Sequence, residues 1–473
     1  MNIITVNNDN SQKKLSIISF SLFSAWLLAF PFAGQVFFAL TEKAKIDAVF
    51  LSMMVVFTHF VGLFISGFFI KKQVAAKMAM ITAMVVCIAG SLIFFLPFSI
   101  LWYISMISIA FFAGLYVSSW GFYYKMYSSS DSRLKTAADV LIYSNIIMII
   151  INVITVHTTA FLGLGLAIIT LLGALFGTFR LEATSNYKEL PKTIEPISGP
   201  LIFLCVFILV ITINSGLMYQ VFNPAFAHFE LLTSYYWAVP YIAALMILRN
   251  MSGKINIAYI FYIAMAMIGL AYILFMWLDR SVISYLLIDT FMLGAFGVCD
   301  LFWWSILGSF LDYSDNPAQV LGIGLSMNVL GIFIGGYMGN VIISLENPYF
   351  YTSVIALFII FLVLIMFPIL NNQLIRLLKS HVFLVNFSNM KESEQEKTLR
   401  RFKESKQLTE KEIDIVKLLL QGYTYKAISE NSFISENTVK FHVKNIYQKL
   451  NINSKMDLVK IFTTFEPKNN KYL

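Results

Sequence analysis

Long apolar segments recur along the first 370 residues and are separated by short polar connections. A helix needs about 20 apolar residues to cross the hydrocarbon core of a bilayer. Segments of this length predict twelve spans: 15–40, 46–70, 78–97, 99–124, 138–157, 161–180, 199–222, 233–249, 255–278, 282–309, 317–343 and 349–370. The composition supports this interpretation, because 58% of residues are hydrophobic and 13% are charged, whereas about a quarter are charged in typical soluble domains. We therefore expect an all-α polytopic membrane protein.

Positive charge is distributed unevenly over the connections between these spans. Cytoplasmic connections are enriched in Lys and Arg, and placing both termini inside divides these residues fifteen to three. The outer side keeps Lys43, Lys45 and Arg280. The inner side holds Lys13, Lys14, Lys71, Lys72, Lys77, Lys125, Arg133, Lys135, Arg180, Lys188, Lys192, Arg249, Lys254, Arg376 and Lys379. This asymmetry predicts an even number of spans and cytoplasmic termini.

The longest polar connection between spans covers residues 181–198 and follows the sixth span. The membrane part is thereby divided into two halves of six helices. This arrangement resembles the major facilitator superfamily, whose members carry two six-helix bundles around a central cavity. The family's signature after the second span has a Gly, an Asp four residues later and a basic pair. Gly67 matches the Gly of this signature, and Lys71 and Lys72 retain its basic character. Lys71, however, stands where the Asp belongs, and this departure argues against transport.

Ionisable side chains at membrane depth mark candidate ligand-binding residues, because they are expensive to bury in lipid. His59 lies in the second predicted span, Asp289 and Asp300 lie in the tenth, and Trp303 follows Asp300 closely. Eleven residues at 100° each return to within about 20° of one helix face, so the two acids are predicted to share a face. A cavity with such a lining would hold a cationic or amphipathic small molecule. The alternative is that these groups hydrogen-bond to one another between helices.

The chemistry-bearing motifs of enzymes and metal proteins are missing from the sequence. Cys87, Cys205 and Cys299 lie in three different spans, so we expect neither a disulfide nor a metal site. The sequence contains no phosphate-binding loop, zinc-protease motif or serine-hydrolase motif. We therefore expect no cofactor and no enzymatic activity.

After residue 370 the chain changes from apolar to polar. We predict five parts: a cytoplasmic tail (1–14), a membrane domain (15–370), a juxtamembrane segment with a charged linker (371–406), a four-helix domain (407–465) and a tail (466–473). Residues 371–387 are apolar with scattered bases, which fits an interfacial segment or a continuing helix. Residues 388–406 are dense in charge and predict a solvated helix or linker.

The segment 408–455 contains residues that mark where its helices begin and end. Thr409 and Glu412 form a capping-box pattern, and Ser435 is placed to cap a later helix. That later helix has one apolar stripe, made of Val439, Val443, Ile446 and Leu450. Another face carries Thr438, Lys440, Phe441 and Lys444. A cationic face on the second helix after a short turn is the layout of a helix-turn-helix that lies in the major groove of DNA.

This segment closely resembles the LuxR/FixJ-type helix-turn-helix family. The shared residues are Leu408, Thr409, Glu412, Leu418, Leu419, Gly422, Lys426, Ile428, Ile434, Ser435, Asn437, Thr438, Val439, Lys440, His442, Val443, Ile446, Lys449 and Leu450. The resemblance implies base contacts from Lys440, Phe441 and Lys444, and phosphate contacts from Thr438 and Lys426. It also implies that two such domains pair through the helix over 454–464.

Together these observations predict a membrane-bound transcriptional regulator. A small molecule of unknown identity would enter the twelve-span domain, and the C-terminal domain would bind double-stranded promoter DNA. The protein would reside in the bacterial inner membrane. One alternative is a secondary transporter that carries a regulatory DNA-binding module, and another is a constitutive regulator that the spans merely tether.

Overall fold

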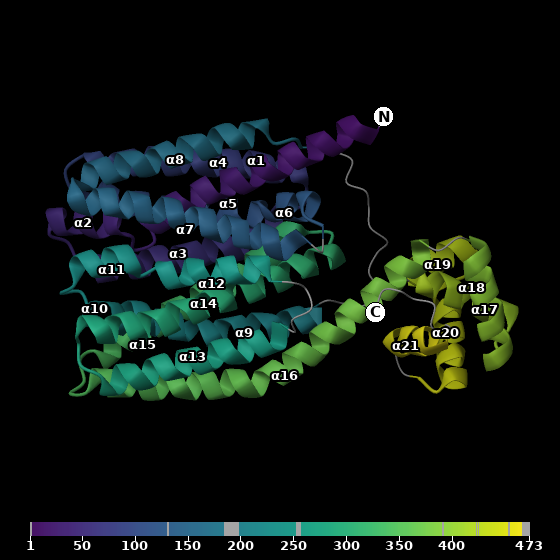
Figure 1. Ribbon diagram of the computed structural model, residues 1–473. Coiled ribbons are helices and arrows are strands. Elements are labelled where there is room, and N and C mark those ends of the chain that lie inside the picture. Colours follow the sequence, from purple (N-terminus) through teal and green to yellow (C-terminus); the bar gives the residue numbers. More distant parts are fainter. Residues whose placement is uncertain are drawn as a thin grey trace. The chain divides into compact units, whose positions relative to one another are not determined.

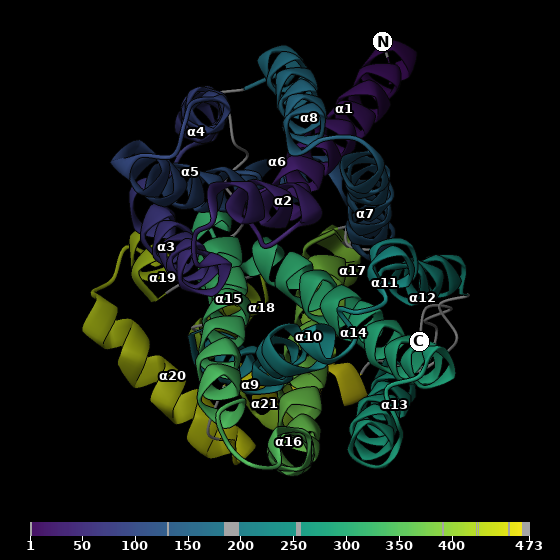
Figure 2. The same cartoon turned by 90° about the vertical axis from the view of Figure 1, so that its left-hand side faces the viewer.

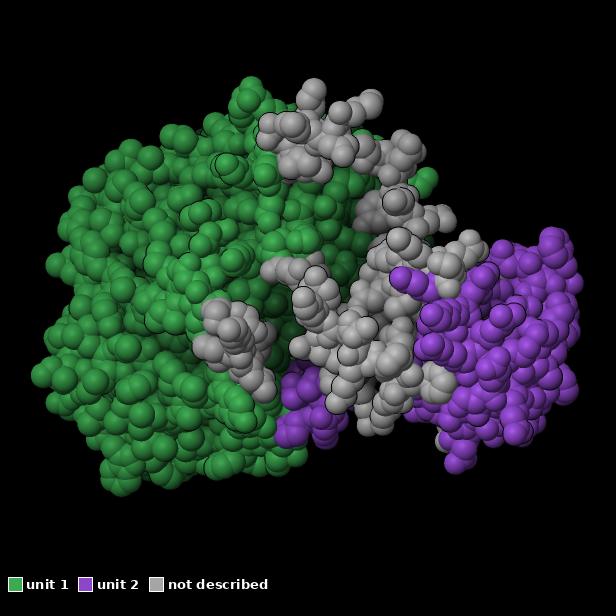
Figure 3. Space-filling view, turned by 45° about the vertical axis from the view of Figure 1, so that its right-hand side comes forward, with its two compact units in different colours: residues 1–187, 201–367 green, residues 188–200, 368–473 purple. Residues whose placement is uncertain are grey.

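The computed structural model describes residues 2–129, 132–183, 198–251, 257–389, 392–421, 423, 425–452 and 455–465. Two compact units divide the chain (Figure 3): residues 1–187 with 201–367, and residues 188–200 with 368–473. We call the first the membrane unit and the second the C-terminal unit. The described residues of both form helices and no strands.

The membrane unit is a bundle of long helices whose axes run in the same general direction (Figure 1). Its first half contains α1 (Asn2–Ala29), α2 (Gln35–Ala44), α3 (Ala48–Phe69), α4 (Gln73–Leu92), η1 (Ile93–Phe95), α5 (Ile100–Ser119), α6 (Gly121–Tyr127), α7 (Arg133–His157) and α8 (Ala160–Arg180). Its second half contains α9 (Ser198–Leu217), η3 (Met218–Phe222), α10 (Asn223–Ala225), α11 (Glu230–Tyr236), α12 (Val239–Asn250), α13 (Ile257–Trp277), α14 (Val282–Phe310), η4 (Leu311–Tyr313), α15 (Pro317–Ile342) and the beginning of α16 (Pro348–Asn389).

Eleven helical segments among the described residues are long and apolar enough to cross a membrane, and they coincide with eleven of the twelve predicted spans. The exception is the first, because the expected continuous span over 15–40 is divided between α1 and α2. The helix ends before Pro31, whose ring cannot continue the hydrogen-bond ladder. Within α1 the charged Lys13 and Lys14 precede the apolar stretch, which therefore covers only residues 15–29 of this helix.

The two halves meet most closely where α3 lies beside α15, an arrangement that is visible in the end view of the bundle (Figure 2). Glycines permit this approach. A Cβ atom on Gly67 would lie 2.5 Å from Cα of Gln319, and one on Gly322 would lie 2.6 Å from the carbonyl oxygen of Leu63. Real Cβ atoms do not come so near to a backbone, so the halves could not pack this way with alanine at either position.

The C-terminal unit contains the end of α16, then α17 (Glu392–Lys406), α18 (Glu410–Leu420), α19 (Tyr425–Ser432), α20 (Glu436–Leu450) and α21 (Lys455–Phe465). The segment 371–387 continues the helix that begins in the last span, which was one of the two expectations for it.

The helix α17 differs from the expectation for this segment, which its many charged residues had indicated to be a solvated helix or linker. Two of its side chains, Leu399 and Phe402, belong to the same buried cluster as the helices that follow. The Phe402 ring is fully buried and its centroid lies 4.8 Å from that of Phe462 in α21. On the same face of α17, the buried Gln395 accepts a hydrogen bond of 3.2 Å from Gln421. The helix is therefore part of the packed domain.

Candidate DNA-binding surface and central cavity

A capping box begins the first helix of the C-terminal four-helix segment, as predicted. The Thr409 hydroxyl accepts a hydrogen bond from the Glu412 amide at 3.3 Å, and the Glu412 carboxylate accepts one from the Thr409 amide at 2.8 Å. The same carboxylate lies 2.7 Å from the Lys449 ammonium near the end of α20, and its side chain is 5% exposed. Burial alone raises the pKa of Glu412, but the hydrogen bonds from Lys449 and Thr409 outweigh it and leave the pKa below its ordinary value. Glu412 therefore ties the start of α18 to the end of α20.

The helix α20 is positioned by the features that the sequence indicated. Ser435 caps it by accepting a hydrogen bond of 3.1 Å from the Thr438 amide. The predicted apolar stripe is confirmed, since all four of its members are buried: Val439, Val443, Ile446 and Leu450. Because this stripe fixes the rotation of the helix, it determines which side chains remain on the surface.

The residues predicted to contact DNA lie on the accessible side of α20. Phe441 is 61% exposed, and Lys440 and Lys444 are also exposed one helical turn apart. Lys440 forms an ion pair of 2.8 Å with Glu436. Such an exposed pair is worth about 0.3–0.5 kcal/mol, so it holds Lys440 only weakly and a DNA phosphate or base could replace Glu436.

Thr438 and Lys426 are the two residues predicted to contact DNA phosphates. The Thr438 hydroxyl is half-buried and lies 2.8 Å from the Ser435 hydroxyl at the start of α20. Lys426 lies in α19, but its side chain is outside the described residues. The predicted pairing helix is α21, whose Leu458, Val459 and Phe462 pack into the core of the domain. Pairing with a second copy would have to use its remaining face.

In the membrane unit, a cavity of about 310 Å³ lies between the two halves. Its lining includes Phe20 of α1, His59 of α3 and Asn145 of α7 from the first half. The second half contributes Tyr219 of η3, Tyr241 of α12, Asp300 and Trp304 of α14, and Asn328 of α15. The structure therefore brings His59 and Asp300 to the same cavity from different halves. The other two candidates, Asp289 and Trp303, are not among its lining residues.

The four candidate ligand residues have different partners. Asp300 accepts a hydrogen bond of 2.7 Å from the Tyr241 hydroxyl. The Nδ1 atom of His59 lies 3.0 Å from the carbonyl oxygen of Ala110, and because a carbonyl can only accept, Nδ1 carries the proton. Asp289 is buried and its Oδ2 atom has no hydrogen-bond partner among the described residues, as is the case for the indole nitrogen of Trp303.

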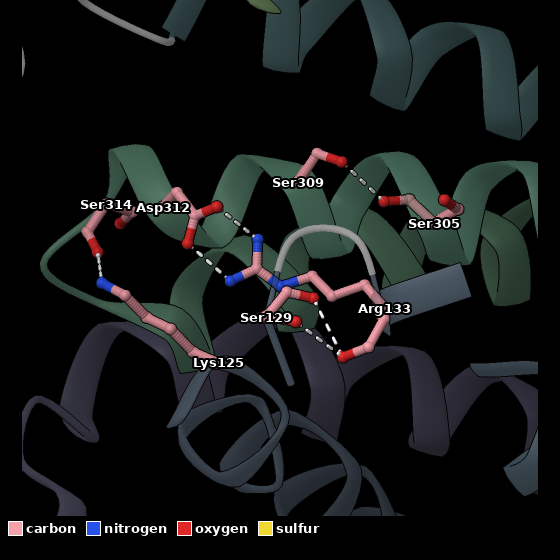
Figure 4. Close-up of polar contacts among 8 residues, drawn as sticks. Lys125, Ser129, Arg133, Ser305, Ser309, Asp312 and Ser314 are labelled. Carbon is pink, nitrogen blue, oxygen red and sulfur yellow. Dashed lines mark hydrogen bonds and ion pairs between the residues drawn. The ribbon is translucent and has the colours of Figure 1, made fainter. Parts of the chain in front are cut away.

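A group of polar contacts at one end of the bundle joins the halves, and we call it the inter-half latch (Figure 4). The Arg133 guanidinium at the start of α7 makes two hydrogen bonds of 2.5 Å to the Asp312 carboxylate in η4. Lys125 donates to the carbonyl oxygen of Ser314 at 2.8 Å. Asn316 donates to the carbonyl oxygen of Gly67 at 2.7 Å. The latch holds the two halves together at this end.

A second ion pair, between Arg249 and Asp139, also joins the halves. From the sequence, Lys125, Arg133 and Arg249 were markers of the cytoplasmic side only, and their acidic partners had no predicted role. The available signal was that Asp139 and Asp312, like these bases, lie at predicted cytoplasmic ends of spans, so a comparison of span ends across the two halves would have found the pairs.

The fold of the membrane unit is found in solved transporter structures. The human organic anion transporter MFSD10 (TETRAN) superposes with a TM-score of 0.60 and 11% identity, covering 75% of this chain and 99% of that one. A bacterial homologue of the iron transporter ferroportin gives 0.58 and 13%, covering 77% and 99%. The N-terminal part of this multi-pass membrane protein thus has the fold of major facilitator transporters, as the sequence predicted.

The C-terminal unit matches known regulators in sequence. Residues 406–462 match the model of bacterial regulatory proteins of the luxR family. The transcriptional regulatory protein DegU of Brevibacillus brevis is 39% identical over 89 residues, which are 18% of this chain and 36% of DegU. The nitrate/nitrite response regulator protein NarP of Escherichia coli is 42% identical over 55 residues, 12% of this chain and 26% of NarP. This chain therefore spans about a third or less of these two relatives.

A third relative consists mainly of the matched segment. The spore germination protein GerE of Bacillus subtilis is 37% identical over 60 residues, which are 13% of this chain and 81% of GerE. The helix-turn-helix geometry of α19 and α20 and these matches agree. Through its DNA-binding C-terminal domain, the chain belongs to the luxR family of bacterial regulatory proteins.

Proposed function

We propose that this protein is a membrane-bound transcriptional regulator that senses a small molecule through its transporter-like membrane unit. Its C-terminal domain would bind promoter DNA with Lys440, Phe441 and Lys444 at the bases and with Thr438 and Lys426 at phosphates. The observation that carries the proposal is the presence, in one chain, of a luxR-family domain and of a cavity whose walls come from both halves of a membrane bundle.

A cavity built from two halves supplies a way for a ligand to act. A ligand shifts a conformational equilibrium only by the difference between its affinities for the two states. Side chains on α3 and α14 change their separation when the halves move, so a molecule that contacts both His59 and Asp300 would favour one arrangement. The inter-half latch, with its Arg133–Asp312 pair, would stabilise the ligand-free arrangement.

The protein would reside in the bacterial inner membrane with both termini in the cytoplasm. The fifteen-to-three division of basic residues supports this orientation, in which the DNA-binding domain would share a compartment with the chromosome. Two copies would pair through α21, because a pair of domains reads two half-sites of DNA.

Replacement of the membrane unit tests the sensing step. A chain in which an unrelated multi-span anchor precedes residues 392–473 should still bind DNA but should lose its response to growth conditions in a promoter-reporter assay. A response equal to that of the full-length chain would contradict sensing by the membrane unit and would leave the spans as a tether.

The cavity and the fold also support a second candidate, a secondary transporter with a regulatory module. Transport requires net flux of a substrate through the cavity, which a sensor does not need. Uptake into proteoliposomes distinguishes the two, because the regulator is expected to bind its ligand in that assay without accumulating it.

A further inference from the structure

The charge of the central cavity is set by one side chain. Among the described residues that line it, Asp300 is the only acid, and neither Lys nor Arg is present. The one other lining side chain that can carry positive charge is His59. When His59 is neutral and Asp300 is ionised, the cavity therefore has a net charge of −1.

Among the described residues, Asp300 has no cationic partner of the kind that two other carboxylates of the membrane unit have. Asp312 is paired with Arg133, and Asp139 with Arg249. For Asp300 the described residues provide one hydrogen bond, from the neutral hydroxyl of Tyr241. An uncompensated carboxylate away from bulk water is energetically unfavourable, and a cation beside it removes most of this penalty.

The remaining wall is suited to an aromatic cation. Trp304 follows Asp300 by one helical turn, and Tyr219, Trp237 and Phe296 line the cavity from neighbouring elements. Aromatic faces attract organic cations within about 6 Å of the ring centroid and stack with other rings. The volume of about 310 Å³ lies at the lower end of the range for small-molecule sites, roughly 300–1,000 Å³, which limits the occupant to one or two rings.

We propose that the cavity binds an organic amine that carries one or two aromatic rings, with its ammonium group on the Asp300 carboxylate. The Nε2 atom of His59, the ring nitrogen not bonded to Ala110, would accept a hydrogen bond from an N–H or O–H of the same molecule. The proposal deepens the proposed function, because this amine would be the signal that the regulator senses, and in that respect it rests on that function.

Direct binding to the full-length chain in lipid nanodiscs tests the charge of the ligand. Phenethylamine, 2-phenylethanol and phenylacetate form one matched set, and 3,3-diphenylpropylamine with its alcohol and acid counterparts forms a two-ring set. Calorimetric titration should show an amine binding at least tenfold more tightly than the matched alcohol and acid. Equal or tighter binding of an alcohol or acid would overturn the proposal, as would the failure of both amines to bind.

Three substitutions locate the effect. Asp300→Asn removes the charge with little change in shape and should weaken amine binding at least tenfold. Asp289→Asn is the matched control, because Asp289 is buried in the same helix outside the cavity, and it should leave binding unchanged. Tyr241→Phe keeps the carboxylate and should weaken binding less than Asp300→Asn does. Unchanged binding in Asp300→Asn, or an equal loss in all three variants, would refute the assignment.

The outcome for DNA binding separates this proposal from the function on which it rests. If the amine binds through Asp300 but leaves promoter occupancy unchanged in cells, the ligand class stands and sensing fails. If occupancy instead responds to an anion or a neutral molecule in both wild type and Asp300→Asn, sensing stands and the ligand class is wrong.

Discussion

Truncation of Phe402 to alanine tests whether α17 belongs to the folded DNA-binding domain. The ring is fully buried and packs against Phe462. Replacing a buried Phe by Ala destabilises a protein by about 3–5 kcal/mol, since the transfer free energy and the cavity left behind add up. The higher helix propensity of alanine returns about 0.5 kcal/mol. We therefore expect a loss of about 2.5–4.5 kcal/mol, a large part of the 5–15 kcal/mol by which a typical domain is stable.

Urea unfolding of the segment 392–473, followed by circular dichroism, measures this loss as a shift of the midpoint at constant slope. The Arg400→Ala variant is the control, because Arg400 is exposed on the same helix and its removal should change stability by less than about 0.5 kcal/mol. A loss of less than about 1 kcal/mol for Phe402→Ala, similar to that of the control, would refute the packing of α17 on this domain.

Three further variants test other contacts. Glu412→Gln should destabilise the domain by about 1–3 kcal/mol. Because folding lowers the pKa of Glu412, the difference in the free energy of unfolding from wild type should be largest at neutral pH and shrink as the pH falls below about 4. A difference that is independent of pH would contradict this. Lys444→Ala should weaken specific DNA binding by about 1–3 kcal/mol and relax the preference at one base position, as measured by selection from random DNA; unchanged selectivity would refute the contact. Asp312→Asn leaves the buried Arg133 without its partner, which destabilises the protein by about 3–5 kcal/mol. The melting temperature of this variant in detergent should therefore be lower than that of the double variant Arg133→Gln/Asp312→Asn. Losses of stability in the two single variants that add up in the double variant would contradict the pairing.

The distribution of apolar residues along the chain was sufficient to predict the general architecture. The apolar run lengths indicated the spans because lipid-facing and core-facing residues are both apolar in a membrane helix. The same reasoning failed at Pro31, where a continuous apolar run is divided into α1 and α2. Hydropathy averages over a window, whereas a single missing amide donor is enough to end a helix.

The rotation of α20 was predictable from the sequence, since the stripe from Val439 to Leu450 determines which of its side chains are buried. The position of α17 was not predictable, because its two buried apolar side chains, Leu399 and Phe402, stand among many charged residues in the sequence. Nor could the sequence tell that Asp300 lines the cavity while Asp289 does not. Both acids occupy one long helix, and which part of that helix adjoins the cavity depends on how the two halves pack.

We propose above all that this membrane protein binds specific promoters through α20. Genome-wide mapping of DNA occupancy tests it most directly, with the full-length wild type compared with the Lys440→Ala/Lys444→Ala variant in the native cell. Both side chains are exposed, so the variant should fold and reach the membrane like the wild type. We expect discrete peaks in the wild type that disappear in the variant. Peaks that persist in the variant, or no discrete peaks for the wild type under several growth conditions, would contradict it.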